Sequence, residues 1–144
     1  MSEESALLLI VDDEPRILSA LRRSLRREPF EVMAVETSRE ALHHLETLAV
    51  DIILSDHKMP GMTGVQLLAA ASRLRPNAVR ILITGWTEEI PPEDMEAIGV
   101  FAVLNKPWDD AALKETLRNA AKARPAAEQQ ATGDAAKLPP WPST

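Results

Sequence analysis

The sequence predicts an α/β fold: a doubly wound, five-stranded parallel sheet with helices on both of its faces. Two observations lead to this prediction. Five short apolar segments alternate along the chain with segments of helical periodicity, and the apolar segments are continuous rather than alternating in polarity. Strands that alternate with helices pair in parallel through right-handed crossovers. A parallel sheet that is covered on both faces is buried on both sides, and its strands are therefore apolar throughout.

The expected strands occupy residues 6–11, 31–35, 52–54, 79–83 and 100–104. Between them, apolar residues recur at the three- and four-residue spacing of a helix that buries one face. The residues that form these stripes are Ile17, Leu18, Leu21 and Leu25; Ala41, Leu42, Leu45 and Leu48; Val65, Leu67, Leu68, Ala71 and Leu74; and Leu113 and Leu117.

The connection between the fourth and fifth strands is less regular. Pro91 and Pro92 cannot lie inside a helix without the loss of a hydrogen bond and a steric clash. Proline does suit the first turn of a helix. We therefore expect this helix to begin at or after Pro91 and to be short or displaced.

The composition is that of one ordinary globular domain followed by a different segment. The chain has 144 residues and a mass of 15.8 kDa, with 45% hydrophobic and 26% charged residues. Residues 1–124 form the expected domain. Residues 125–144 contain four prolines among Ala, Gln, Gly and Thr, which predicts a Pro/Ala-rich linker or disordered tail.

Charge and cysteine content argue against several classes of function. The chain has 16 Lys and Arg against 22 Asp and Glu, and its net charge of −6 argues against direct binding of nucleic acid or an anionic membrane. It has no cysteine, so disulfides and thiolate metal sites are excluded. No apolar run approaches about 20 residues, and the first residues lack a signal-peptide pattern. We therefore expect a cytoplasmic protein.

Polar residues follow four of the expected strands. Since the carboxyl ends of parallel strands lie at one edge of the sheet, where open α/β sheets bind ligands, these side chains are expected to lie together. They are Asp12 and Asp13 after the first strand, Ser55 and Asp56 after the third, Thr84 after the fourth, and Asn105 and Lys106 after the fifth.

The chemistry of this set indicates phosphoryl transfer. Three neighbouring carboxylates repel one another unless a cation lies between them, and Mg²⁺ suits oxygen ligands of this kind. Lys106 offers a positive charge that can pair with Asp56 or with a phosphoryl oxygen, and Thr84 offers a hydroxyl donor to another phosphoryl oxygen. A carboxylate is a competent nucleophile for the transfer. The sequence has no glycine-rich nucleotide loop, so a bound nucleotide is not expected.

These residues resemble the receiver domain of response regulators in two-component signal transduction. The resemblance covers roughly residues 5–123 and implies a flavodoxin-like sheet of strand order 2-1-3-4-5. It also implies that Gly64 helps to shape the loop after Asp56. The segments that carry it are Ile10-Val11-Asp12-Asp13-Glu14, Leu54-Ser55-Asp56-His57-Lys58-Met59-Pro60-Gly61, Leu82-Ile83-Thr84-Gly85 and Leu104-Asn105-Lys106-Pro107-Trp108.

The resemblance implies a role for each residue of the site. Asp56 would be the phosphoacceptor, and Asp12, Asp13, Asp56 and the main-chain carbonyl of Lys58 would bind Mg²⁺. Thr84 would be the switch hydroxyl and Lys106 the lysine that contacts phosphate, followed by a cis-proline junction. The domain would be a signalling phosphoacceptor rather than an enzyme, catalysing only its own phosphorylation and dephosphorylation. Its partners would be a sensor histidine kinase or phosphotransfer protein and an output domain or effector protein.

One position departs from the usual pattern of the family. Three residues before Lys106, where an aromatic residue is usual, this chain has Val103. An alternative interpretation is therefore a pseudo-receiver that acts as a constitutive protein-interaction module. A second alternative is a flavodoxin-like FMN or phosphohydrolase domain, since one architecture supports several functions. An FMN site, however, needs a phosphate-binding loop after the first strand, where this chain has Asp12 and Asp13.

Overall fold

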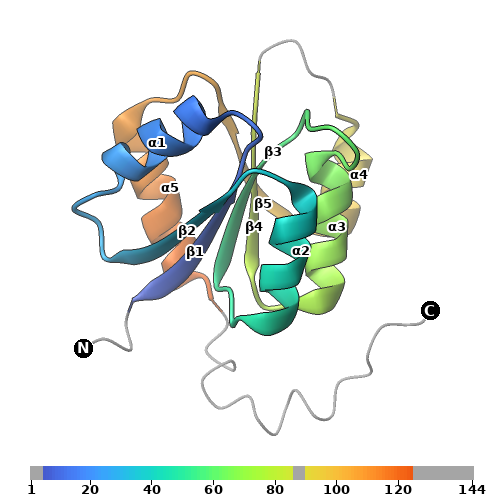
Figure 1. Cartoon of the computed structure of the whole chain (residues 1–144). Coiled ribbons are helices and arrows are strands. Elements are labelled where there is room, and N and C mark those ends of the chain that lie inside the picture. The colour runs from blue at the N-terminus through green and yellow to red at the C-terminus, as the bar shows by residue number, and fades with distance from the viewer. Residues whose placement is uncertain (1–4, 86–89, 125–144) are drawn as a thin grey trace, which may run out of the picture.

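The computed structural model describes residues 5–85 and 90–124, which form a five-stranded parallel sheet between two layers of helices (Figure 1). The order across the sheet is β2-β1-β3-β4-β5, and every neighbouring pair is parallel. This confirms the α/β class and the expected strand order. The predicted tail, residues 125–144, lies outside the described residues. The strands are β1 (Ala6–Val11), β2 (Phe30–Val35), β3 (Ile52–Asp56), β4 (Val79–Thr84) and β5 (Val100–Asn105).

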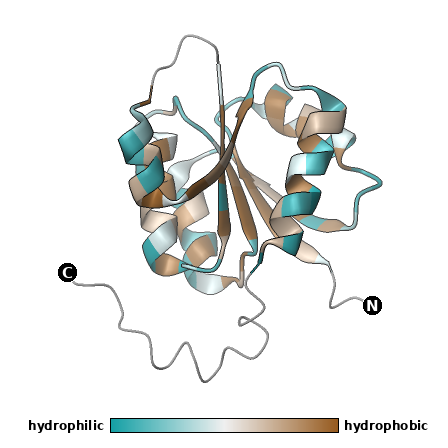
Figure 2. Ribbon diagram, turned by 180° about the vertical axis from the view of Figure 1, so that it is seen from behind, coloured by the Kyte–Doolittle hydropathy of each residue, from teal (hydrophilic) through white to brown (hydrophobic). Residues whose placement is uncertain are grey.

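The helices are α1 (Pro15–Ser24), α2 (Ser38–Thr47), α3 (Gly64–Leu74), α4 (Pro92–Ile98) and α5 (Asp110–Lys122). Apolar side chains of α1 and α5 pack on one face of the sheet, and those of α2, α3 and α4 pack on the other. Figure 2 shows the apolar strands enclosed between helices whose outer surfaces are largely hydrophilic. In the part of the chain that the structure describes, no helix has the length and apolar character needed to cross a membrane.

Three strands extend at their carboxyl ends beyond the apolar segments that predicted them. β3 continues through Asp56, β4 through Thr84 and β5 through Asn105. The backbone pairing accounts for this difference, because Asp56 is paired with Ile83 and Thr84 with Asn105. The polar residues thus belong to the ordered ends of the strands, which hold their side chains more firmly than a loop would.

Helix α4 is short, as the two prolines predict. It begins at Pro92, has seven residues and ends at Ile98; the cap that follows is Gly99, whose φ of 77° is favoured by glycine. Its C-terminal end is tied to the sheet by Arg80, whose Nε donates to the carbonyl oxygen of Ile98 at 2.9 Å. The same guanidinium donates to two carbonyls of the loop between α3 and β4.

Strand β5 is an edge strand that contains a β-bulge. Arg80 is paired with Val100, whereas the next residue, Ile81, is paired with Ala102. Phe101 is therefore an extra residue in the ladder, and 43% of its surface is exposed.

Candidate functional site

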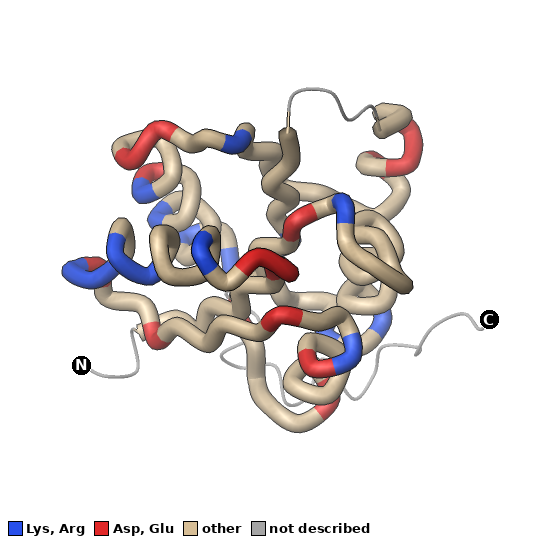
Figure 3. The backbone as a smooth tube through the Cα atoms, turned by 45° about the horizontal axis from the view of Figure 1, so that its top comes forward, with Lys and Arg blue, Asp and Glu red and all other residues tan. Residues whose placement is uncertain are grey.

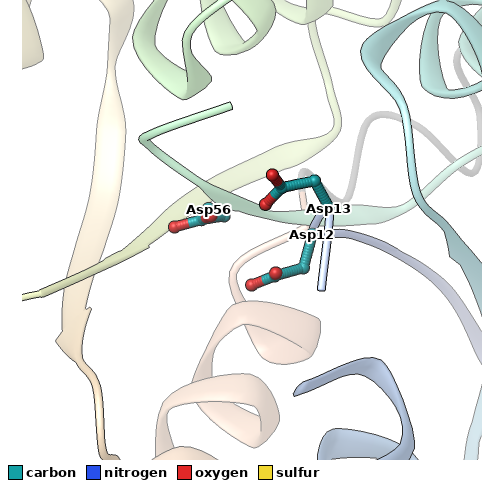
Figure 4. Close-up of side chains that lie close together, drawn as sticks. All are labelled: Asp12, Asp13 and Asp56. Carbon is teal, nitrogen blue, oxygen red and sulfur yellow. The ribbon is translucent and has the colours of Figure 1, made fainter. Parts of the chain in front are cut away.

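Three carboxylates converge at the carboxyl edge of the sheet. Asp12 and Asp13 follow β1 directly, and Asp56 is the last residue of β3. One oxygen from each of the three lies within 4.8 Å of the others (Figure 4). Figure 3 turns this edge toward the viewer and shows acidic segments near the middle of the molecule. We refer to Asp12, Asp13 and Asp56 as the acidic cluster.

Lys106 neutralises part of the acidic cluster. Its Nζ atom lies 3.0 Å from Oδ2 of Asp12 and 3.1 Å from Oδ1 of Asp56. The sequence had suggested a pairing of Lys106 with Asp56 or with a phosphoryl oxygen, and the second carboxylate partner is an addition from the structure. The peptide bond between Lys106 and Pro107 is cis, as the resemblance implied.

Burial changes the acid–base properties of these groups. Asp12 is fully buried and Asp56 is 4% exposed, and desolvation raises the pKa of both carboxyls. The charge of Asp12 raises the pKa of Asp56 further, while Lys106 acts in the opposite direction. Burial lowers the pKa of Lys106, but its hydrogen bonds to the two carboxylates outweigh that effect and leave the pKa raised. Lys106 therefore remains protonated at neutral pH.

The acidic cluster has the properties of a site for a hard cation. Oδ1 of Asp12 accepts the main-chain N–H of Glu14 at 2.9 Å, and its buried Oδ2 is paired with the Lys106 ammonium at 3.0 Å. Three converging carboxylates outnumber this single ammonium, and buried negative charge is costly unless a cation compensates it. Asp13 is more open to solvent and borders a groove of about 300 Å³. The three side chains could therefore hold a metal ion from one side, and the other side of the ion would remain accessible from the groove.

Thr84 and Lys58 flank the acidic cluster. Thr84 ends β4 and is 5% exposed, and its hydroxyl donates to the carbonyl oxygen of Gly85 at 3.4 Å. The carbonyl oxygen of Thr84 in turn accepts the N–H of Lys106 at 2.9 Å, which joins β4 to the lysine. Lys58 lies two residues beyond Asp56 in the loop before α3, with its side chain exposed to solvent.

The loop after Asp56 is shaped by Gly64, the first residue of α3. The N–H of Gly64 donates to the carbonyl oxygen of His57 at 2.7 Å. A Cβ atom at this position would collide with the main-chain carbonyl of Asp56. The hydroxyl of Ser55 donates to that same carbonyl at 2.8 Å. Because Gly64 has no side chain, the start of α3 can pack directly against the main chain of Asp56 and His57. This contact fixes the orientation of Asp56, the candidate phosphoacceptor.

The fold and the arrangement of these residues agree with one protein family. The profile of the response regulator receiver domain matches residues 8–118, which is most of the chain. The chain belongs to this family. Receiver domains are signalling phosphoacceptors of two-component systems rather than enzymes in the usual sense, and the buried carboxylate at the end of β3 fits that role.

Curated relatives of this receiver domain are regulators and a kinase. The hydrogenase transcriptional regulatory protein HoxA of Cupriavidus necator is 40% identical over 128 residues, which cover 86% of this chain and 26% of HoxA. The transcriptional regulatory protein GlrR of Escherichia coli is 34% identical over 120 residues, covering 83% of this chain and 27% of GlrR. Sensor kinase CckA of Brucella abortus is 31% identical and covers 79% of this chain and 12% of CckA. The receiver domain thus spans about a quarter or less of these proteins.

Solved structures show the same architecture over most of the chain. A signal receiver domain of an HD domain-containing protein from Pseudomonas fluorescens has a TM-score of 0.79 at 30% identity, covering 83% of this chain and 97% of that one. A CheY-like receiver domain from Methanospirillum hungatei has a TM-score of 0.78 at 30% identity, covering 83% and 96%. Chemotaxis response regulator CheY4 of Vibrio cholerae has a TM-score of 0.73 at 28% identity, covering 81% and 98%.

Proposed function

We propose that Asp56 is the phosphoacceptor of this receiver domain and that Thr84 and Lys106 bind the phosphoryl group. The observation that carries the proposal is the buried carboxylate of Asp56, whose Oδ1 lies 3.1 Å from the Lys106 ammonium nitrogen. A carboxylate can attack a phosphoryl group, and a fixed cation beside it offsets the charge of the transferring group. The donor is a phosphohistidine on a sensor histidine kinase or a phosphotransfer protein.

The chain's own residues account for the transfer. A carboxylate oxygen of Asp56 attacks phosphorus in line with the bond to the donor imidazole; the new P–O bond forms as the P–N bond breaks, and the imidazole nitrogen keeps the electron pair. Lys106 contacts a phosphoryl oxygen while it stays paired with Asp12. The hydroxyl of Thr84 turns from the Gly85 carbonyl to donate to a second phosphoryl oxygen. Attack of water on phosphorus later releases phosphate and restores the carboxylate, so the domain catalyses only its own phosphorylation and dephosphorylation.

The proposed metal is Mg²⁺. Asp12, Asp13 and Asp56, together with the main-chain carbonyl of Lys58, would hold it, because Mg²⁺ prefers hard oxygen ligands and accepts few carboxylates. When bound, the ion would neutralise charge on the phosphoryl oxygens. The convergence of three carboxylates beside a single ammonium group, that of Lys106, and the solvent-facing side of Asp13 support this assignment.

The phosphorylated domain would switch its binding to an output domain or an effector protein. The place where the family usually has an aromatic residue is Val103, which lies on edge strand β5 and is 43% exposed. Any switch in this chain therefore works without a ring at that position. The absence of cysteine supports a reducing compartment, and we propose that the domain acts in the cytoplasm.

The proposal is tested by treating the whole chain with acetyl phosphate and Mg²⁺ and following its intact mass. The wild-type chain is expected to gain the mass of one phosphoryl group, and Asp56→Asn is expected to gain none. Asp109→Asn is the matched control, because asparagine can replace this exposed aspartate as the cap of α5. Labelling of Asp56→Asn would show that another residue is the acceptor, and an unlabelled wild-type chain would favour a pseudo-receiver.

A further inference from the structure

A hydrogen-bonded link joins the segment after Lys106 to the far end of α1. The indole Nε1–H of Trp108 donates to Oγ of Ser24 at 3.4 Å, and the Ser24 hydroxyl donates to Oδ1 of Asp110 at 2.7 Å. Ser24 is the last residue of α1, and Asp110 is the first residue of α5. We call Ser24, Trp108 and Asp110 the helix link. It connects two helices that cover the same face of the sheet.

The helix link lies where it can fix the position of Lys106. Trp108 is two residues after Lys106, and its ring packs against the apolar core between the sheet, α1 and α5. On the other side, the N–H of Lys106 donates to the Thr84 carbonyl oxygen at 2.9 Å. The main chain that carries Lys106 is therefore held by β4 before the proline and by α1 after it. Both anchors lie within two residues of Lys106, whose Nζ atom is 3.0 and 3.1 Å from the two carboxylates.

Helix α1 also contacts the site at its other end. Glu14 immediately precedes α1, and its N–H donates to Oδ1 of Asp12 at 2.9 Å. The ten residues of α1 thus run from the acidic cluster to Ser24. One helix is joined at its start to a carboxylate partner of Lys106 and at its end to the segment that follows Lys106.

We infer that Ser24 is a positioning residue for Lys106, acting through Trp108 and Asp110. The inference rests on the proposed function, in which Lys106 contacts the incoming phosphoryl group. A serine hydroxyl can donate to one group and accept from another at the same time, so the single oxygen of Ser24 holds both partners. Removing it releases the indole and the Asp110 carboxylate together, and Lys106 loses one of its two anchors.

The test measures the rate of phosphorylation of the full chain by acetyl phosphate with saturating Mg²⁺, followed by intact mass. Ser24→Ala and Trp108→Phe are each expected to slow it about threefold to tenfold, the factor that corresponds to one hydrogen bond. Ser24→Thr, which keeps the hydroxyl, is expected to retain the wild-type rate. Ser72→Ala is the matched control, because the Ser72 hydroxyl donates only to a carbonyl of its own helix, α3, and it too should retain the rate.

A second background separates positioning from general damage to the fold. In Lys106→Ala, the further change Ser24→Ala is expected to have no effect, because the side chain that it positions is gone. The inference would be overturned if Ser24→Ala lowered the phosphorylation rate by the same factor in both backgrounds. It would also be overturned if Ser24→Ala left the rate unchanged in the wild-type background. If Ser24→Ala does not fold by circular dichroism, Trp108→Phe decides in its place, since the phenyl ring keeps the packing. An unlabelled wild-type chain would instead overturn the proposed function, and the inference with it.

Discussion

The ammonium nitrogen of Lys106 lies 3.0 Å from Oδ2 of Asp12, although β1 and β5 are separated in the sheet by β3 and β4. The ion pair therefore spans the two intervening strands and passes the carboxyl end of β3, where Asp56 lies. Lys106 keeps an anionic partner even when the charge of Asp56 is removed by substitution. Variants of Asp56 consequently leave Lys106 paired with Asp12, and their effects can be attributed to Asp56 itself.

Replacement of Asp13 by alanine should weaken the stabilisation of the protein by Mg²⁺. An ion that binds the native state alone raises the midpoint of thermal unfolding, and Asp13 supplies one of the three convergent carboxylates. The measurement compares the rise in midpoint on addition of millimolar Mg²⁺ for wild type and Asp13→Ala. Glu36→Ala is the control, since Glu36 lines the groove beside Asp13 but is not in the acidic cluster. An equal rise in the unfolding midpoint for wild type and Asp13→Ala would show that Asp13 does not bind the ion.

Without metal, the ionised acidic cluster should destabilise the fold in a pH-dependent way. Desolvation first, and the charge of Asp12 second, raise the pKa of Asp56 above its ordinary value of 3.8. The folded state therefore binds a proton more readily than the unfolded state, and ionisation of Asp56 costs stability at every pH above its folded pKa. In EDTA, Asp56→Asn should thus unfold at a higher temperature than wild type at pH 7, and the gap should close as the pH falls toward 4.

Thermal unfolding of both proteins in EDTA across that pH range checks the prediction. Asp109→Asn controls for the loss of one negative charge, because Asp109 is exposed at the start of α5. If the gap between Asp56→Asn and wild type widened on acidification, the pKa of Asp56 would have to be lowered by folding rather than raised.

Gly64→Ala should destabilise the protein and misplace Asp56. The new Cβ atom would collide with the carbonyl of Asp56, and relief of such overpacking costs about 1–3 kcal/mol. Gly85→Ala is the matched control, because a Cβ atom there meets no atom of the described residues within 4 Å. Chemical denaturation gives the stability change, and labelling by acetyl phosphate gives the functional effect. Equal behaviour of the two variants would mean that the loop adjusts without cost.

Arg80→Met should loosen α4 without unfolding the domain. No residue of α4 is fully buried, and the guanidinium of Arg80 binds the last carbonyl of that helix, at Ile98. Loss of this bond should speed amide hydrogen exchange in α4 by about fivefold or more, as expected for one hydrogen bond. Arg75→Met is the reciprocal control, since Arg75 donates to the Leu45 carbonyl at the end of α2. Faster exchange should then appear in α2 and not in α4.

The fold was predictable because the strongest signals in this sequence are local. Continuous apolar segments such as residues 52–54 of β3, all of them buried, indicate the burial of both faces of the sheet. The same pattern predicts which residues meet, because parallel strands end at one edge. Asp12, Asp13 and Asp56 were therefore predictable as neighbours, and the structure brings them together.

The contacts between side chains were not predictable in the same way. The sequence places Lys106 at the correct edge, but its second partner, Asp12, depends on the depth and direction of a long flexible side chain. The link from Ser24 to Trp108 depends on how α1 crosses α5, a tertiary relationship that helical periodicity leaves open. The β-bulge at Phe101 likewise leaves no mark in the apolar pattern of β5, because the residues on either side of it are also apolar.

The β-bulge at Phe101 affects how readily a strand from another molecule can pair with edge strand β5. An edge strand presents unpaired main-chain groups to which a strand from another molecule can add, and exposed apolar side chains such as Phe101 and Val103 would favour such addition. A bulge bends the strand and increases its local twist, so a straight strand from another molecule can form main-chain hydrogen bonds with only a short part of β5. The extra residue in β5 thus protects the sheet against continuation into an aggregate while leaving an apolar surface exposed.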